Sequence, residues 1–170
     1  KESFQQLNSN GWTAAELQNP INENEPCLRG SLFKSLFSAV NNNVKKGYSS
    51  IKVFEVGNVF QKEKRGFAQS LHLAGIIYYH EPNQTWNQKK FVYDFFSMKA
   101  EILKLLQTLG VYNAEFKKTS SVTPFNENAL VIFVGKQKIG LIGEIDLSIT
   151  DKLIKKAAFG FEIYPEKITL

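Results

Sequence analysis

The strongest constraint on the fold is a long amphipathic helix followed directly by an apolar strand. Apolar residues recur at about every fourth position, which predicts a helix over residues 26–46 with one broad apolar face. Pro26 suits the first turn of this helix, and Gly47, which follows two lysines, is typical of a helix end. Another layer of the protein must cover this apolar face. The residues of the apolar face are Leu28, Leu32, Phe33, Leu36, Phe37, Val40 and Val44.

The next element is predicted to be a strand over residues 51–60, and both of its faces are apolar. Such a strand is typical of the centre of a sheet that is covered on both sides. A second apolar strand over residues 71–79 predicts an antiparallel hairpin with the first, joined by the polar residues 61–70. The alternation in the first strand places Ile51, Val53, Glu55 and Val59 on one face and Phe54, Val56 and Phe60 on the other.

The rest of the chain contains further strands and one more long helix. Asp94 can cap a helix over residues 95–109, and Gly110 suits its end. Antiparallel hairpins interleaved with two long helices predict an α+β fold, an antiparallel sheet flanked by helices, in a single domain over residues 1–170. The other predicted elements are a short strand within 12–18, a loop over 80–92, a hairpin of strands 129–134 and 139–145, a short helix over 148–156 and a last strand over 159–163.

Several motifs resemble those of one protein family in their order and spacing. They read Asn-Pro at 19–20, Cys-Leu-Arg-Gly-Ser-Leu at 27–32, Asn-Val-Lys-Lys-Gly at 43–47 and Phe-Glu-Val-Gly-Asn-Val-Phe at 54–60. They are similar to the pattern NP, LR-x-SLL, N-x-x-RG and FE-x-G-x-VF of the beta subunit of bacterial phenylalanyl-tRNA synthetase, in its catalytic-like domain. Residues 94–100 resemble the family's DFF-x-x-KG motif. The chain departs from the family at 125–128 and 146–147, where Pro-Gly-Arg and His-Pro are usual.

The resemblance implies a class II aminoacyl-tRNA synthetase-like fold and a part in protein synthesis in the cytoplasm. In this family the whole enzyme is an alpha2-beta2 heterotetramer, and its alpha subunit uses ATP and magnesium to join phenylalanine to tRNA. The chain would then be a non-catalytic fragment of a longer beta chain that packs against the alpha subunit, and tRNA would be bound by the whole enzyme. The resemblance implies no cofactor or metal in this fragment, and no membrane or DNA partner.

The arginine content bears on catalysis, because the sequence has only Arg29 and Arg65. A class II synthetase site, as the resemblance describes it, needs arginines in its second and third motifs. A planar guanidinium binds phosphate through two hydrogen bonds and stacks on adenine, which lysine does less well. Arg65 is the one candidate near the second motif, and the third motif has none. We therefore expect no catalytic residue in this chain.

Other catalytic patterns are missing from the sequence, which has no phosphate-binding glycine loop, no HExxH and no CxxC. His72 is expected on the outer face of its strand, and the single cysteine, Cys27, on the apolar side of the first helix. Glu55 lies on an otherwise apolar strand face, so we expect it to have a partner such as Arg29; a relic of a ligand pocket is the functional alternative. The residues expected to support a subunit interface or the fold are Arg29, Leu32, Phe33, Leu36, Phe54 and Glu55.

The net charge of +5 leaves other functions open. The lysines are spread along the chain as pairs and form no basic tract, which favours an ordinary solvated surface over RNA contact. A stand-alone RNA-binding or adaptor module would use these lysines together with exposed aromatic residues such as Trp86 and Tyr93. A small-molecule enzyme acting by itself would have to bind ATP, and the scarcity of arginine argues against it.

Overall fold

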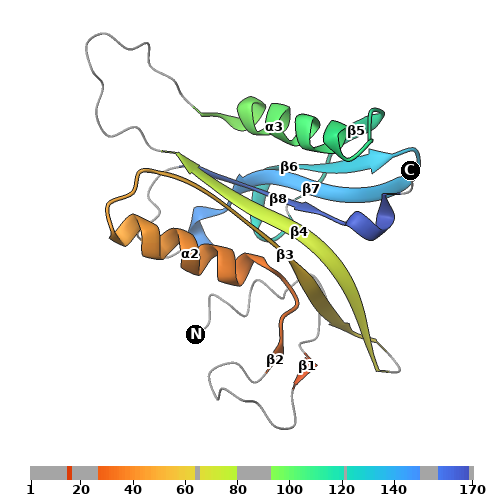
Figure 1. Cartoon of the computed structure of the whole chain (residues 1–170), viewed down its shortest axis with the longest axis horizontal. Helices are drawn as coiled ribbons and strands as arrows, with labels where there is room; N and C mark the ends of the chain where they lie inside the picture. The colour runs from red at the N-terminus through yellow and green to blue at the C-terminus, as the bar shows by residue number, and fades with distance from the viewer. Residues whose placement is uncertain are drawn as a thin grey trace.

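A computed structural model describes residues 15–16, 27–63, 66–79, 93–120, 122–149 and 157–168. Within these residues, one antiparallel sheet has six strands in the order β3-β4-β8-β7-β6-β5, and a separate pair is made by β1 and β2 (Figure 1). The strands are β1 (Ala15–Glu16), β2 (Cys27–Leu28), β3 (Ser50–Lys62), β4 (Phe67–Tyr79), β5 (Ala114–Lys118), β6 (Phe125–Val134), β7 (Gln137–Ile145) and β8 (Ala158–Ile163).

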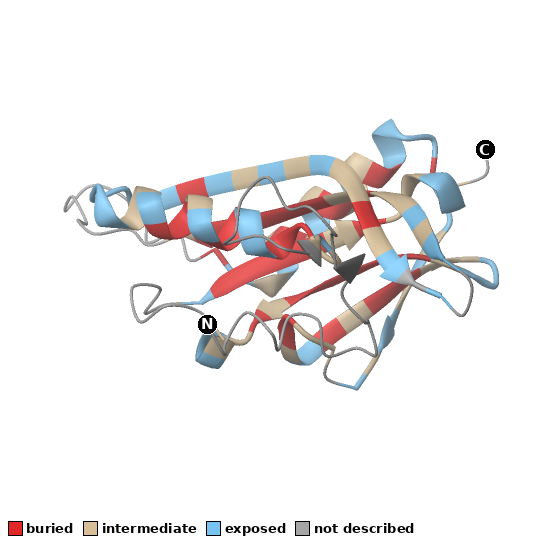
Figure 2. Cartoon of the chain, turned by 90° about the horizontal axis from the view of Figure 1, so that it is seen from below, coloured by how far each residue is buried: buried red, intermediate tan, exposed pale blue. Residues whose placement is uncertain are grey.

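Two long helices lie on opposite faces of the six-stranded sheet, α2 (Phe33–Lys45) on one and α3 (Phe95–Thr108) on the other (Figure 1). Each helix packs on its own apolar core, because successive strand residues point to opposite faces of the sheet. Figure 2 shows the buried residues concentrated on the inner strands and on the inward sides of the helices. This arrangement confirms the predicted α+β fold with helices flanking an antiparallel sheet.

The first long helix begins at Phe33, seven residues later than predicted. Cys27 and Leu28 form strand β2 and pair with Glu16 and Ala15, so the prediction that Cys27 lies on the helix was wrong. The predicted end was correct. Gly47 has a φ of +88°, which glycine adopts without strain, and its N–H donates to the carbonyl of Val44.

Strands β3 and β4 form the predicted hairpin, paired from Ser50 with Tyr79 to Lys62 with Phe67. The predicted loop over 61–70 was too long, because residues 61–62 and 67–70 belong to the paired strands. The position of β3 differs from the prediction. It lies at the edge of the sheet, and it is not a central strand covered on both sides. The reason is that the second neighbour of β4 is β8, which occupies the centre of the sheet. The α2-facing side of β3 is packed, whereas Phe54 on the other side is 73% exposed.

The C-terminal half follows the prediction except at two places, and one of them is β5, which the sequence did not predict. Asp94 caps α3, because its carboxylate accepts a hydrogen bond from the Ser97 N–H at 2.8 Å, and β6, β7 and β8 form at the predicted places. The described part of the predicted helix over 148–156 is a 3-10 turn, η2 (Leu147–Ile149), and Asp146 caps it instead of Ser148. A second 3-10 turn, η3 (Pro165–Lys167), follows β8. The predicted loop over 80–92 lies outside the described residues.

Candidate subunit interface

A polar junction ties the segment before α2 to strand β3. The Arg29 guanidinium forms an ion pair with Glu55 through Nη1, and its Nε donates to the carbonyl of Asn58 at 2.8 Å. The hydroxyl of Ser35, in the first turn of α2, donates to the other oxygen of Glu55. Arg29 also accepts, through its backbone carbonyl, the N–H of Phe60 at 2.9 Å. Glu55 therefore has the partner that the sequence predicted, and it links three segments of the chain.

Gly57 makes the space in which the Arg29 side chain lies. A Cβ atom at position 57 would lie 2.2 Å from Nη2 of Arg29, which is far inside van der Waals contact. Any other residue there would displace the guanidinium from Glu55. The Phe-Glu-x-Gly sequence of β3 and the Leu-Arg-x-Ser sequence before α2 are thus the two halves of one structural junction.

The structure separates the remaining predicted interface residues into two groups. Leu32, Phe33 and Leu36 are buried in the core between α2 and the sheet, so their contacts serve the fold of this chain. Phe54 points to the opposite side of β3 and is largely exposed. Of these four side chains, Phe54 alone is accessible to another protein.

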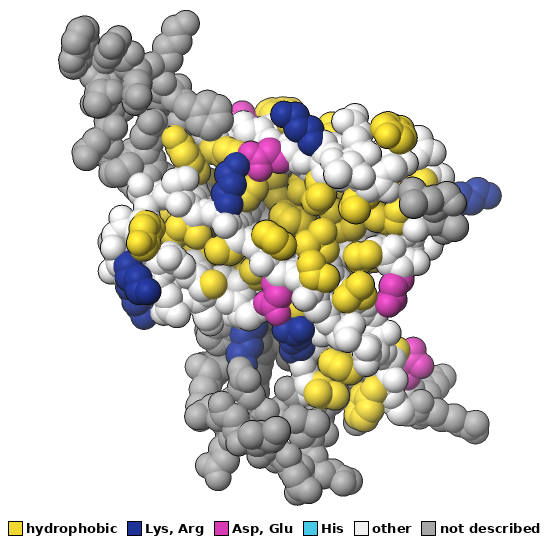
Figure 3. All heavy atoms as spheres, viewed as in Figure 1, with side chains coloured by type: hydrophobic (Ala, Val, Ile, Leu, Met, Phe, Trp, Pro, Cys, Tyr) yellow, Lys and Arg dark blue, Asp and Glu magenta, His cyan; other side chains and the backbone are white. Residues whose placement is uncertain are grey.

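Among the described residues, apolar side chains on the α3 side of the edge strand β3 are left uncovered, and we call this surface the open face. Val56 is 54% exposed beside Phe54, and half-buried Leu73 lies opposite Val56 on β4. The Phe161 ring lies over Gly75, where a Cβ would lie 2.5 Å from its Cε1 atom, and Gly75 pairs with Phe54. Figure 3 shows apolar side chains gathered on this side of the molecule, below α3.

The cover that α3 provides ends at an ion pair. Lys52 on β3 donates from Nζ to Glu101 on α3 at 2.6 Å, and the same ammonium lies 5.3 Å from the centroid of the Tyr93 ring. Burial raises the pKa of the Tyr93 phenol, and the Glu101 carboxylate raises it further. Beyond Lys52 along β3, the side chains of Phe54 and Val56 are exposed. The open face therefore begins next to this ion pair.

A buried polar network lies at the far end of β4, and the prediction that His72 is on an outer face was wrong. His72 is 6% exposed, with Nδ1 at 2.8 Å from the Glu162 carboxylate and Nε2 at 3.1 Å from the Ser70 hydroxyl. Tyr164 stacks on the imidazole, with ring centroids 4.8 Å apart. Burial raises the pKa of the Tyr164 phenol, so it stays protonated and donates to Glu162. Sequence reasoning missed this network because Glu162 is 90 residues from His72.

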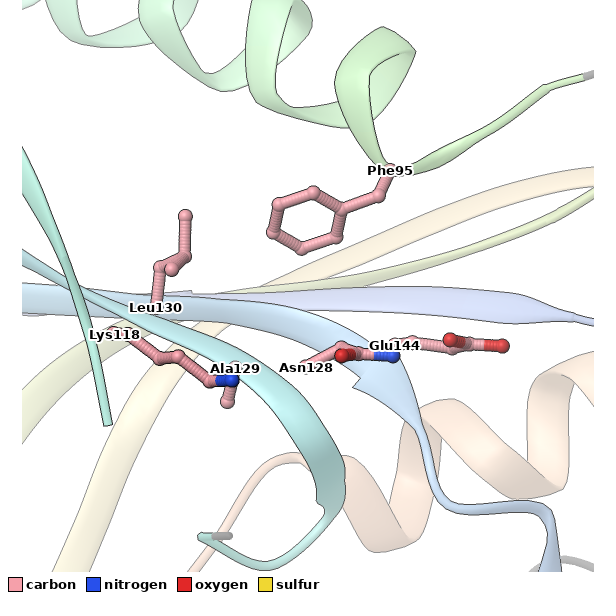
Figure 4. Close-up of a pocket in the computed structure, with 6 residues that line it drawn as sticks. All are labelled: Phe95, Lys118, Asn128, Ala129, Leu130 and Glu144. Carbon is pink, nitrogen blue, oxygen red and sulfur yellow. The ribbon is translucent and has the colours of Figure 1, made fainter. Parts of the chain in front are cut away.

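Ser70, His72 and Glu162 are aligned as a nucleophile, a base and an orienting carboxylate would be. None of the three lines the cavity that the structure shows between the start of α3 and the sheet (Figure 4). That cavity has a volume of about 270 Å³. The Glu144 side chain points away from Lys118 in Figure 4, so the two charges do not converge on one ligand. The residues that line the cavity are Phe95, Lys118, Asn128, Ala129, Leu130 and Glu144.

The described residues hold no group of three His, Cys, Asp or Glu side chains that could bind a metal ion. Among the same residues, no helix is long and apolar enough to cross a membrane. Arg65, the arginine expected near the second synthetase motif, lies outside the described residues. The other arginine, Arg29, is engaged by Glu55 and Asn58.

The features expected of an RNA-binding module are only partly present. Tyr93 is buried, so it cannot stack on a base, and Trp86 lies outside the described residues. Two of the lysine pairs are described, one at the end of α2 and one on β5, at the edge of the sheet opposite β3. Several lysine ammonium groups lie over aromatic rings of the chain itself, including Lys99 over Phe116.

Comparison with known proteins identifies relatives over most of the chain. The family model of the phenylalanyl tRNA synthetase beta chain CLM domain matches residues 1–164. The phenylalanine–tRNA ligase beta subunit of Wigglesworthia glossinidia brevipalpis is 32% identical over 155 residues, which cover 88% of this chain and 19% of that protein. That of Lactobacillus johnsonii is 28% identical over 161 residues, which cover 91% of this chain and 19% of that protein. The chain thus spans about a fifth of the length of these curated relatives.

A solved structure shows the same fold with little sequence likeness. Desulfitobacterium hafniense PylSc, a pyrrolysyl tRNA synthetase, superposes with a TM-score of 0.69 at 14% sequence identity. The match covers 98% of this chain and 55% of that one. This likeness confirms the predicted class II synthetase-like fold.

Proposed function

Because this chain belongs to the phenylalanyl-tRNA synthetase beta chain family, we propose that it is a non-catalytic domain of a phenylalanine–tRNA ligase beta subunit. In this proposal the domain packs against an alpha subunit. That subunit uses ATP and magnesium to charge tRNA with phenylalanine in the cytoplasm, and two alpha–beta pairs form a heterotetramer. The domain contributes a surface to the assembly and leaves the chemistry to its partner.

The observation that carries this proposal is the open face. Monomeric soluble proteins seldom expose large contiguous apolar surfaces, and where they do the surface is often a protein interface. Here Phe54 and Val56 are more than half exposed on one side of β3, while its other side joins the core under α2. A partner subunit that covered them would remove this apolar area from water, which is the main favourable term in most protein associations.

The chemistry of the described arginine supports a structural role. A synthetase that activates an amino acid needs a guanidinium free to bind phosphate. The Arg29 guanidinium instead forms an ion pair with Glu55 and donates a hydrogen bond to the backbone carbonyl of Asn58. Its charge is used to attach the segment before α2 to β3, so we assign it to the fold.

Co-expression with the matching alpha subunit tests the proposal. We expect this chain to co-purify with alpha, and Phe54→Lys to abolish co-purification because a charge would then be buried in the interface. The control is Phe96→Lys, since Phe96 is 76% exposed at the start of α3 and lies off the open face. A folded wild-type chain that fails to bind alpha would reject the proposal.

A second measurement tests whether this chain has catalytic activity of its own. We expect no ATP–pyrophosphate exchange with phenylalanine from this chain alone, and exchange from preparations that contain alpha. Exchange by the isolated chain would assign it an active site and overturn the non-catalytic part of the proposal.

A further inference from the structure

The outer edge of β3 presents a row of backbone groups that no described strand pairs with. The direction of these groups follows from two hydrogen bonds at one end of the strand. The Phe60 N–H donates to the Arg29 carbonyl, and the Asn58 carbonyl accepts from Arg29 Nε, so residues 58 and 60 point their backbone groups away from β4. Because backbone direction alternates along a strand, Lys52, Phe54 and Val56 point theirs the same way.

Among the described residues, this edge has few of the devices that usually protect a sheet edge. Natural edge strands are short, bulged, interrupted by proline or lined with charges. β3 has 13 residues, its pairing with β4 is continuous, and it contains no proline. Between Lys52 and Asn58, the side chains on the α3 side are the apolar Phe54 and Val56. A strand placed along this edge would find unpaired hydrogen-bonding groups and an apolar surface side by side.

The chain itself closes one end of the edge. Arg29 occupies the backbone groups of Asn58 and Phe60, so the free part runs from Lys52 to Val56. At the other end, the Lys52 side chain is held by Glu101 of α3. The free edge is therefore the length of a short added strand, bounded by two ion pairs.

We propose that an extended segment of the partner alpha subunit adds to this edge as a seventh strand of the sheet, antiparallel or parallel to β3. This inference rests on the proposed function and names how the partner is held. The added segment would place apolar residues against Phe54 and Val56, between the Arg29–Glu55 and Lys52–Glu101 ion pairs. Main-chain hydrogen bonds then supply affinity and the alternating side chains supply specificity, as in other cases of strand addition.

Charge favours a different chain over a second copy of this one. The molecule has a net charge of +5, so two copies brought edge to edge repel each other, whereas a segment of net negative charge is attracted. A homodimer through β3 is the alternative occupant, and the test below distinguishes it.

Amide hydrogen exchange on the wild-type chain, free and bound to the matching alpha subunit, tests the proposal directly. In the free chain the N–H groups of Phe54 and Val56 should exchange rapidly, while those of Val53 and Glu55, which face β4, are protected. On binding, exchange at the N–H groups of Phe54 and Val56 should slow by at least about tenfold. Binding of alpha without this protection overturns strand addition while the proposed function stands. Absence of binding overturns both.

Proline substitution gives an independent readout. Val56→Pro removes one outward N–H and leaves the pairing with β4 intact, because edge positions tolerate proline. We expect alpha to bind at least about tenfold more weakly, whereas Val56→Thr, which keeps the N–H, changes binding much less. Lys118→Pro on the opposite edge strand β5 is the matched control and should bind normally.

Equal binding by Val56→Pro and Val56→Thr overturns the inference, since a seventh strand needs that N–H. Protection of Phe54 and Val56 in the free chain that rises with protein concentration, with a dimeric mass, also overturns it and assigns the edge to a second copy. If Val56→Pro does not fold, which circular dichroism shows, the exchange experiment on the wild type decides.

Discussion

The two helices cover their faces of the sheet in different ways. α2 has no side-chain cap at its own N-cap residue, Leu32, and it is fixed by tertiary contacts through Ser35, Glu55 and Arg29. α3 is capped locally by Asp94 and is tied to β3 by the exposed pair Lys52–Glu101. The α2-facing residues of β3 are packed, whereas Phe54 and Val56 on its α3-facing side are left exposed.

This difference shows how one strand can serve both folding and assembly. The α2-facing residues of β3 join a core that the chain completes by itself. The residues on the other side form the open face, which is apolar and incomplete. Substitutions on the α2 side should therefore change stability, and those on the open face should change binding.

The largest contrast is expected between two phenylalanines. Phe33→Ala removes a buried ring that contacts Phe37 and Phe125, and it should lower the free energy of unfolding by about 3–5 kcal/mol. Phe54→Ala removes an exposed ring and should change the free energy of unfolding by less than about 0.5 kcal/mol. The same substitution should weaken binding to alpha. Urea unfolding of both variants checks this. Similar losses of stability would show that Phe54 belongs to the folding core.

The two ion pairs of β3 should also contribute unequally to the free energy of unfolding. Loss of the Arg29 pair should cost more than loss of the Lys52 pair, and both should cost less than Phe33→Ala. Arg29→Met breaks contacts to Glu55 and Asn58 together, and we expect a loss of about 1–3 kcal/mol. Lys52→Met breaks an exposed pair and should cost about 0–1 kcal/mol. Urea unfolding at low and high salt measures both. Equal losses would mean that Arg29 forms an ordinary surface pair.

Gly57 allows the junction to be tested from its other side. Gly57→Ala should destabilise the fold by about 1–2 kcal/mol, because the new methyl group displaces the Arg29 guanidinium. In the Arg29→Met background the same substitution should cost much less. A double-mutant cycle measures this coupling. Additive losses would show that the cost of the methyl group arises elsewhere.

The smallest effect is expected at the cap of α3. Hydrogen bonds from the Ser97 N–H and hydroxyl lower the pKa of Asp94 below 3.8. A lowered pKa in the folded state means that the stabilisation is complete above about pH 4 and is lost as the pH falls through the folded-state value. Asp94→Ala should therefore reduce stability at pH 7, and the difference from wild type should shrink in acid. Thermal unfolding between pH 7 and pH 2.5 measures this difference in stability. Asp94→Asn, which keeps a hydrogen-bond acceptor, is the control.

Local patterns predicted the elements but not the order of the strands. Helix ends at Gly47 and Gly110, the cap at Asp94 and the two hairpins depend on residues close in sequence, so they could be read from it. The partner of Glu55 followed from the cost of leaving a charge unpaired on an apolar face. The edge position of β3 depends on β8, whose pairing with β4 joins residues from Tyr78 and Ala158, 80 positions apart, to Leu73 and Ile163, 90 positions apart.

The site was predictable only in part for the same reason. Alternation placed Phe54 and Val56 on one face of β3, but it could not show that α3 leaves them exposed. It also left His72 without Glu162, which β8 brings beside it. The start of α2 was missed because Cys27 and Leu28 pair with another segment, which outweighs their fit to the helical period.

The central place of β8 has a consequence for synthesis on the ribosome. Each hairpin can pair as soon as its own residues emerge, since Ser50 and Tyr79 are only 29 positions apart. The two hairpins share no ladder and are joined through β8, which pairs with β4 on one side and β7 on the other. Translation must therefore pass Ile163 before one sheet exists. A nascent chain stalled before Ala158 holds two separate hairpins with open edges, exposed to aggregation and to the chaperones that meet unfinished proteins.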